Sequence, residues 1–327
     1  MCSLQTDYSV LRKVGGALYA SIGSVGIGLN LITGITFLSV KEFRKPAFFL
    51  MSSLCFSDAL VLTFIGLYGG VRLLETSSLR LTDLDRYTFL VQATEWFTGA
   101  VLFAIISFNR LITIRFWAKL DIYFSRCATG VLCIAPHLLM FVLDCVIFFV
   151  VSDRPSFWSS EFMTVAGGHW IAYRVNEVIV YTSVVLQVTF NSWTLLSIRR
   201  RRKVESDASA EQSTAFKTNL KRESRLATQC VITSCVFCLT TVLWQILAHL
   251  SNRYRIPLEL LVGMHIFWLF NHLLNPVIYF SLNGKLREVI GRAFFNVVPK
   301  SRTTTMAMSS TAGALPTDGN VHKTDKT

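Results

Sequence analysis

Residues 127–151 read CATGVLCIAPHLLMFVLDCVIFFVV, an apolar run in which Asp144 is the one Asp, Glu, Lys or Arg side chain. A helix needs about 20 mostly apolar residues to cross the hydrocarbon core of a bilayer. Comparable runs occupy residues 15–40, 46–70, 88–111, 175–198, 226–250 and 256–282. Their length and the lack of alternating polarity favour helices over the strands of a membrane barrel. The sequence therefore predicts seven transmembrane helices.

The composition agrees with a polytopic membrane protein. Of the 327 residues, 52% are apolar and 16% are charged, and the mean hydropathy is +0.48. Soluble domains carry about 25% charged residues. This balance speaks against a disordered chain, a disulfide-stapled miniprotein and a soluble enzyme. Because the sequence has no metal-ligand spacing, nucleophile elbow or phosphate loop, we expect no enzymatic activity and no cofactor.

The distribution of Lys and Arg predicts the orientation. Of 32 basic residues, 23 lie in the connections after the first, third and fifth spans and in the tail. The other 9 lie in the amino-terminal segment and the remaining three loops. The positive-inside rule then places residues 1–14 outside the cell and the tail in the cytoplasm. The net charge of +12 is thus an orientation signal, and we expect the lipid bilayer, not a nucleic acid, as partner.

Two segments follow or interrupt the spans. Residues 283–296 place apolar side chains at helical spacing against Lys285, Arg287 and Arg292, which predicts a short amphipathic helix on the membrane surface. Residues 199–225 and 297–327 are polar enough to be flexible, and 297–327 is expected to be a disordered cytoplasmic tail. The predicted fold class is an all-α membrane protein, a seven-transmembrane helix bundle with a short cytoplasmic amphipathic helix.

Charged residues inside spans are costly and mark functional candidates. Asp58 lies mid-span in SLCFSDAL (53–60), and Arg110 closes the third span in SFNRL (107–111). The first span carries GIGLNL (26–31), and the seventh ends in NPVIY (275–279). In this order and at these depths, the motifs make the chain resemble a rhodopsin-type G-protein-coupled receptor over residues 15–295.

Three further stretches resemble the nematode serpentine chemoreceptors, most nearly class x. They are Asn109 with Arg110, KLDIYFS (119–125) and RESRLATQ (222–229). The resemblance implies a chemosensory receptor of the plasma membrane, and of sensory cilia, with a small-molecule or peptide ligand outside and a heterotrimeric G protein inside. It also implies an arrestin and a receptor kinase as partners of the Ser/Thr-rich tail. The basic stretch 199–225 contacts either the G protein or anionic lipid.

The inner half of the bundle is expected to hold a conformational switch. Its six residues are Asn30, Asp58, Asn271, Asn275, Pro276 and Tyr279. Asn271 and Asn275 are one turn apart and could meet Asp58 and Asn30 across the bundle, and a buried polar cluster has more than one arrangement. The plainer alternative is that these groups only join helices. Binding of a sodium ion or a proton at Asp58 is a further hypothesis.

The chain departs from the receptor pattern in informative ways. By resemblance, Arg110 faces the G protein, but most family members have an acid just before this arginine, where Asn109 stands here. The usual neighbouring ion pair is therefore missing. The seventh span contains no lysine, which excludes a retinal Schiff base and the opsin class.

A ligand pocket is predicted in the outer half of the bundle, where aromatic walls meet a few polar groups. Glu95 lies about 10 Å below the outer end of its span, at 1.5 Å per residue. The tryptophans could equally be interfacial or packing residues, and the histidine a helix-packing residue. The predicted lining is Gln92, Glu95, Trp96, Trp244, Gln245, His265 and Trp268.

Two other functional classes compete with a chemosensory receptor. A neuropeptide or neurotransmitter receptor of the same fold would more often carry cysteines and glycosylation sequons in the outer loops, which this chain lacks. A transporter or channel is the third class. Transporters commonly show internal repeats with interrupted spans, and no repeat relates the first and last three spans.

Overall fold

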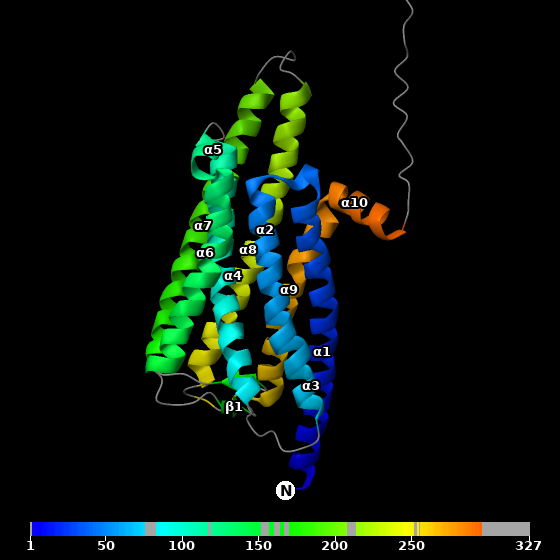
Figure 1. Ribbon diagram of the computed structural model, residues 1–327, viewed down its shortest axis with the longest axis vertical. Helices are drawn as coiled ribbons and strands as arrows, with labels where there is room; N and C mark the ends of the chain where they lie inside the picture. Colours follow the sequence, from blue (N-terminus) through cyan, green and yellow to red (C-terminus); the bar gives the residue numbers. More distant parts are fainter. Residues whose placement is uncertain are drawn as a thin grey trace, which may run out of the picture.

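The computed structural model of the chain is a bundle of long helices packed side by side (Figure 1). Among the residues that the structure describes, seven helical stretches are long and apolar enough to cross a membrane, as predicted. The structure describes residues 2–75, 83–116, 119–151, 157–159, 164–166, 170–207, 214–251, 254 and 256–295. The predicted fold class, a seven-helix membrane bundle, is confirmed.

Each predicted span corresponds to one helix or to a run of joined helices. In chain order they are α1 (Cys2–Ser39), α2 (Pro46–Val61) continued by η2 (Leu62–Tyr68) and α3 (Gly69–Leu74), α4 (Asp83–Arg115), α6 (Arg126–Val146) continued by η4 (Ile147–Val151), α7 (Trp170–Asp207), α8 (Thr214–Ser251) and α9 (Leu258–Leu282). η2 and η4 are π-helical. Short helices η1 (Lys41–Phe43) and α5 (Leu120–Tyr123) lie in two connections.

Several helices continue beyond the apolar runs that predicted them. α1 begins at Cys2, within the segment predicted to precede the first span. α7 extends to Asp207 and α8 begins at Thr214, so the expected flexibility of residues 199–225 is wrong for both flanks. Arg, Lys and Glu are good helix formers and can extend a helix into water. The predicted tail, 297–327, lies outside the described residues.

Two smaller elements complete the described part of the chain. An antiparallel ribbon pairs β1 (Phe157–Ser159) with β2 (Thr164–Ala166) between the fourth and fifth spans, an element that the sequence did not predict. After α9, α10 (Gly284–Phe295) turns away from the bundle (Figure 1). Leu286 and Ile290 are buried on one face of α10, as predicted for an amphipathic helix.

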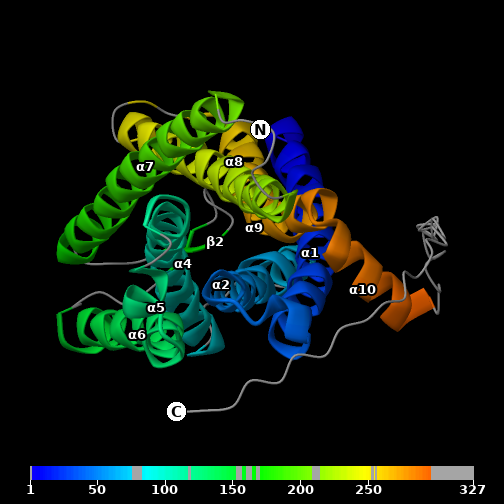
Figure 2. The same cartoon turned by 90° about the horizontal axis from the view of Figure 1, so that it is seen from above.

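The third span lies at the centre of the bundle and the fourth lies at its edge. In the most apolar 18-residue window of α4, 78% of the residues are buried, whereas the figure for α6 is 11%. Figure 2 shows α4 between α6 and α7, with α9 between α1 and α8. Side chains of α4 can therefore contact several helices at once, whereas α6 turns most of its apolar surface outward.

Glycines let the first two spans approach closely. A Cβ atom added to Gly66 would lie 2.7 Å from the Cα atom of Gly23, and one added to Gly23 would lie 2.5 Å from the backbone nitrogen of Leu67. Real Cβ atoms essentially never approach so near. The small residues therefore bring the backbones of α1 and η2 together, as is common between membrane helices.

Candidate functional site

Asp58 is the centre of a buried polar cluster in α2. Its side chain is 2% exposed, and the amide nitrogen of Asn275 donates to Oδ2 over 2.6 Å. Nδ1 of His272 lies 2.6 Å from Oδ1. Asn30 joins from α1, where Nδ2 donates to the backbone oxygen of His272 over 3.1 Å. The structure thus brings Asn30, Asp58 and Asn275 together, with His272 as a fourth member that the sequence reasoning missed.

The other predicted switch residues lie beside this cluster. Asn271 is buried, but its amide nitrogen has no hydrogen-bond partner among the described residues. Pro276 lies inside α9, which continues to Leu282. Tyr279 is buried and packs against Phe37 of α1, with ring centroids 5.9 Å apart.

One face of α9 carries five buried side chains at helical spacing. They are His265, Trp268, His272, Asn275 and Tyr279. Residues three and four apart on a helix lie on the same face. This spacing was the signal by which His272 could have been found, since it lies between two residues that were predicted.

Four of the predicted pocket residues form a continuous aromatic layer between helices. Ring centroids are 4.9 Å apart between Trp244 and His265, 6.1 Å between His265 and Trp268, and 5.1 Å between Trp268 and Trp96. His272 contacts both Trp96 and Trp268, at 5.6 and 5.3 Å. The aromatic layer, Trp96, Trp244, His265 and Trp268, therefore joins α4, α8 and α9 and adjoins the Asp58 cluster through His272.

Glu95 has a different environment. It is buried, and its carboxylate oxygens lie 3.0 and 3.2 Å from Nδ1 of His137 on α6. Nε2 of His137 lies 3.0 Å from the hydroxyl oxygen of Ser53 on α2. The acid therefore meets its partner at the junction of α2, α4 and α6, on the side away from the aromatic layer. Gln92 and Gln245, the remaining predicted pocket residues, are half-buried.

Arg110 lies near the carboxyl-terminal end of α4 and is 2% exposed. Its Nη1 donates to Oε2 of Glu223 on α8 over 3.3 Å. The other oxygen of Glu223 accepts from Nζ of Lys45 over 3.2 Å. Neither amide atom of the neighbouring Asn109 has a partner in the described part of the chain. Glu223, on another helix, is thus the acidic partner of Arg110, in place of an acid at position 109.

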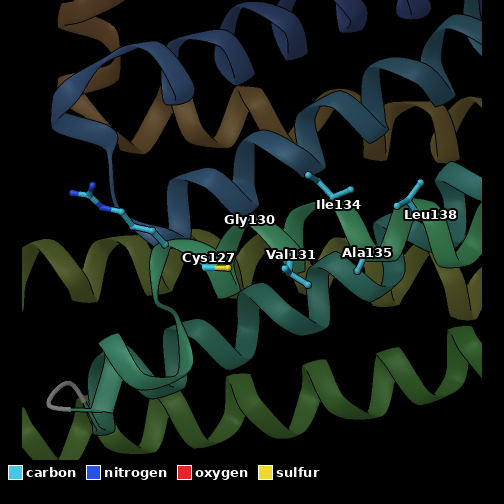
Figure 3. A pocket seen from close by; sticks show the side chains of 7 residues that line it. Cys127, Gly130, Val131, Ile134, Ala135 and Leu138 are labelled. Carbon is cyan, nitrogen blue, oxygen red and sulfur yellow. The ribbon is translucent and has the colours of Figure 1, made fainter.

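One face of α6 carries an apolar groove (Figure 3). Its volume is about 390 Å³, and none of its lining residues belongs to the predicted pocket. Its lining residues are Arg126, Cys127, Gly130, Val131, Ile134, Ala135 and Leu138. Among the described residues, no group of three or more His, Cys, Asp or Glu side chains could hold a metal ion.

Known proteins share both the sequence pattern and the fold. A family model described as "Serpentine type 7TM GPCR chemoreceptor Srx" matches residues 21–283. A relative from Caenorhabditis elegans is described as a probable G-protein coupled receptor. It is 20% identical over an alignment of 338 residues, and the alignment covers 88% of this chain and 68% of that protein. Squid rhodopsin has a similar fold, with a TM-score of 0.73 at 17% identity over 88% of this chain and 86% of that one.

The match to the family model covers most of the chain, including every element of the site except the outermost part of α1. It confirms the resemblance to class x receptors that the sequence motifs indicated. The protein is a multi-pass membrane receptor and not an enzyme. The chain belongs to the Srx family of serpentine seven-transmembrane chemoreceptors, which are G-protein-coupled receptors.

Proposed function

We propose that this receptor binds a small extracellular ligand in the outer half of the bundle and activates a heterotrimeric G protein at the cytoplasmic end. The amino terminus faces outward and the tail faces the cytoplasm, as the distribution of Lys and Arg favours. The ligand contacts the aromatic layer, with Gln92 and Gln245 at its margin. Glu95 supports the site through its pair with His137.

One observation carries this proposal. The two helices that contribute Trp96 and Trp244 to the aromatic layer, α4 and α8, are also joined at their cytoplasmic ends by Arg110 and Glu223. A ligand that binds one arrangement of these helices more tightly shifts the population toward it. Separation of the helices would break the ion pair and expose Arg110 to the G protein. Linkage requires in turn that the G protein raise agonist affinity.

The Asp58 cluster is the candidate for the element between the two ends. His272 contacts Trp96 and Trp268 through its ring and Asp58 through Nδ1. A rearrangement of the aromatic layer would therefore change the hydrogen bonds of Asp58, and with them the packing of α2 against α9. Two discrete arrangements of a packed polar cluster are the physical requirement for such coupling.

A sodium ion fits this cluster poorly as it stands. Sodium needs oxygen ligands, but both carboxylate oxygens of Asp58 lie 2.6 Å from nitrogen atoms, of His272 and Asn275. The buried Oδ1 of Asn30 has no partner among the described residues, so one oxygen ligand is present. A cation would have to displace one of the two nitrogen groups from the carboxylate.

Ligand-dependent nucleotide exchange tests the proposal. Purified receptor in nanodiscs would be screened with odorants and peptides for stimulation of GDP release from a heterotrimeric G protein. Arg110→Ala should abolish stimulation, whereas Arg115→Ala, at an exposed arginine of the same helix, should preserve it. Stimulation that survives Arg110→Ala would contradict the proposal. Current or uptake in the absence of any G protein would favour a channel or transporter.

The tail and the location of the receptor complete the proposal. Ser301, Ser309, Ser310 and the neighbouring threonines would accept phosphate from a receptor kinase and then bind an arrestin. Phosphopeptide mapping of the stimulated receptor, with arrestin recruitment in wild type and in a Ser/Thr→Ala tail, tests this step. Location at the plasma membrane of sensory cilia is tested by imaging of a tagged receptor in sensory neurons.

A further inference from the structure

Two buried polar side chains lie at the outer end of the bundle without hydrogen-bond partners. Tyr19 on α1 is 0% exposed, and its hydroxyl oxygen has no partner among the described residues. His265 on α9 is 3% exposed, and neither of its ring nitrogens has a partner there. The two rings face each other across the α1–α9 contact, with centroids 6.2 Å apart and planes 7° from parallel.

Such groups need an explanation, because the great majority of buried polar atoms in native proteins are hydrogen-bonded. The residues that the structure describes do not supply hydrogen-bond partners for these groups. His265 contacts the indole rings of Trp244 and Trp268. Polar groups that bind a ligand lack hydrogen-bond partners when no ligand is present, and such sites lower the stability of the protein.

The charges around this position indicate what kind of ligand would fit. The carboxylate of Glu95 is paired with His137 on the far side of α4. Asp85, towards the extracellular end, accepts a hydrogen bond from Tyr68 over 2.8 Å and pairs with Arg72 at 3.4 Å. No carboxylate among the described residues is recorded in contact with Tyr19 or His265, so a cationic ligand would bring a charge into an aromatic site with no counter-ion.

We propose that Tyr19 and His265 anchor the ligand, and that the ligand is a neutral small molecule with an oxygen group and an apolar body. The oxygen accepts from the hydroxyl of Tyr19, and one ring nitrogen of His265 bonds to the same group as donor or as acceptor. The apolar body packs against Trp244 and Trp268. This inference rests on the proposed function for the existence of a ligand, but it makes predictions about binding alone.

The first test requires no ligand. If the hydroxyl of Tyr19 is unsatisfied, Tyr19→Phe removes a buried polar group and should raise the melting temperature of the ligand-free receptor in nanodiscs by about 2 °C or more. Tyr181→Phe, at an exposed tyrosine of α7, should leave it unchanged. A lower melting temperature for Tyr19→Phe would mean that the hydroxyl has a structural partner, such as a buried water, and would overturn the inference.

The second test uses four probes with one carbon skeleton: ethylbenzene, acetophenone, 1-phenylethanol and 1-phenylethylamine. The two oxygen-containing probes should raise the melting temperature of the wild type more than ethylbenzene does, and the amine should not. The difference should vanish in Tyr19→Phe with His265→Leu. Preference for the amine, no preference, or a preference retained in the double variant would each overturn the inference.

Neither measurement involves a G protein. A receptor that binds the oxygen-containing probes through Tyr19 and His265 but never stimulates nucleotide exchange would refute the proposed function and keep this inference. A receptor that signals through Arg110 but is indifferent to Tyr19→Phe and His265→Leu would do the reverse.

Discussion

Replacement of Glu223 by glutamine should raise the activity of the receptor without ligand. The change keeps the size of the side chain but removes the charge that faces Arg110, which is 2% exposed, across 3.3 Å. Glu223 is 19% exposed, so the pair lies between an exposed one, worth about 0–1 kcal/mol, and a fully buried one, whose disruption costs about 3–5 kcal/mol. An intermediate loss of about 1–2 kcal/mol corresponds to a roughly 5–30-fold change in an equilibrium constant.

This loss of stability affects the arrangement in which α4 and α8 are joined by the pair. The arrangement in which the two helices are separated has no such pair and is not destabilised. Basal nucleotide exchange by Glu223→Gln in nanodiscs should therefore rise several-fold over wild type, with a smaller additional response to agonist. Lys45→Gln is the matched control, because it removes a second ion pair of Glu223 at a side chain that is 47% exposed. Unchanged basal exchange in Glu223→Gln, or an equal rise in Lys45→Gln, would refute the role given to Arg110.

Three further predictions concern the interior of the bundle. Glu95→Gln should lower the free energy of unfolding by about 1–3 kcal/mol, because it breaks a largely buried pair with His137. If Glu95→Gln instead lowers agonist potency without lowering the melting temperature, Glu95 is a ligand contact. Gly66→Ala should lower the free energy of unfolding by about 1–3 kcal/mol, because α1 and η2 are in close contact there. Gly130→Ala is the control, since an added Cβ at Gly130 meets nothing within 4 Å. If the melting temperature of Gly66→Ala is no lower than that of Gly130→Ala, the prediction is wrong. Agonist affinity should be the same in sodium and in choline chloride, since both oxygens of Asp58 face nitrogen groups; a sodium-dependent radioligand affinity would place a cation there.

Hydrophobic runs were sufficient to predict the spans, because a membrane helix must be apolar over a fixed length. They could not predict where helices end outside that length. The polar flanks of α7 and α8 contain Arg, Lys and Glu, which have high helix propensity, and neither flank contains a Pro or Gly that would break the helix. The ribbon of β1 and β2 was missed since three-residue strands carry too short a pattern to read.

The polar contacts of the inner half were partly accessible from spacing. Asn275 meets Asp58, and Asn30 reaches the same cluster, as one-turn spacing and equal depth predicted. His272 was missed although it lies on the same face of α9. Glu223, the partner of Arg110, was also missed, because ion pairs between helices leave no mark in local spacing.

Depth along a span can be counted from the sequence, but rotation about the helix axis cannot. Consecutive residues of an α-helix point about 100° apart, so Glu95 and Trp96 share a depth and face different helices. Trp96 turns toward α9 and contacts His272, while Glu95 turns toward His137 on α6. The same rotation sets both contacts, so any turn of α4 that separated Glu95 from His137 would also move Trp96 against His272. A ligand that moves Trp96 is therefore expected to strain the contact between α4 and α6 as well as the hydrogen bonds of Asp58.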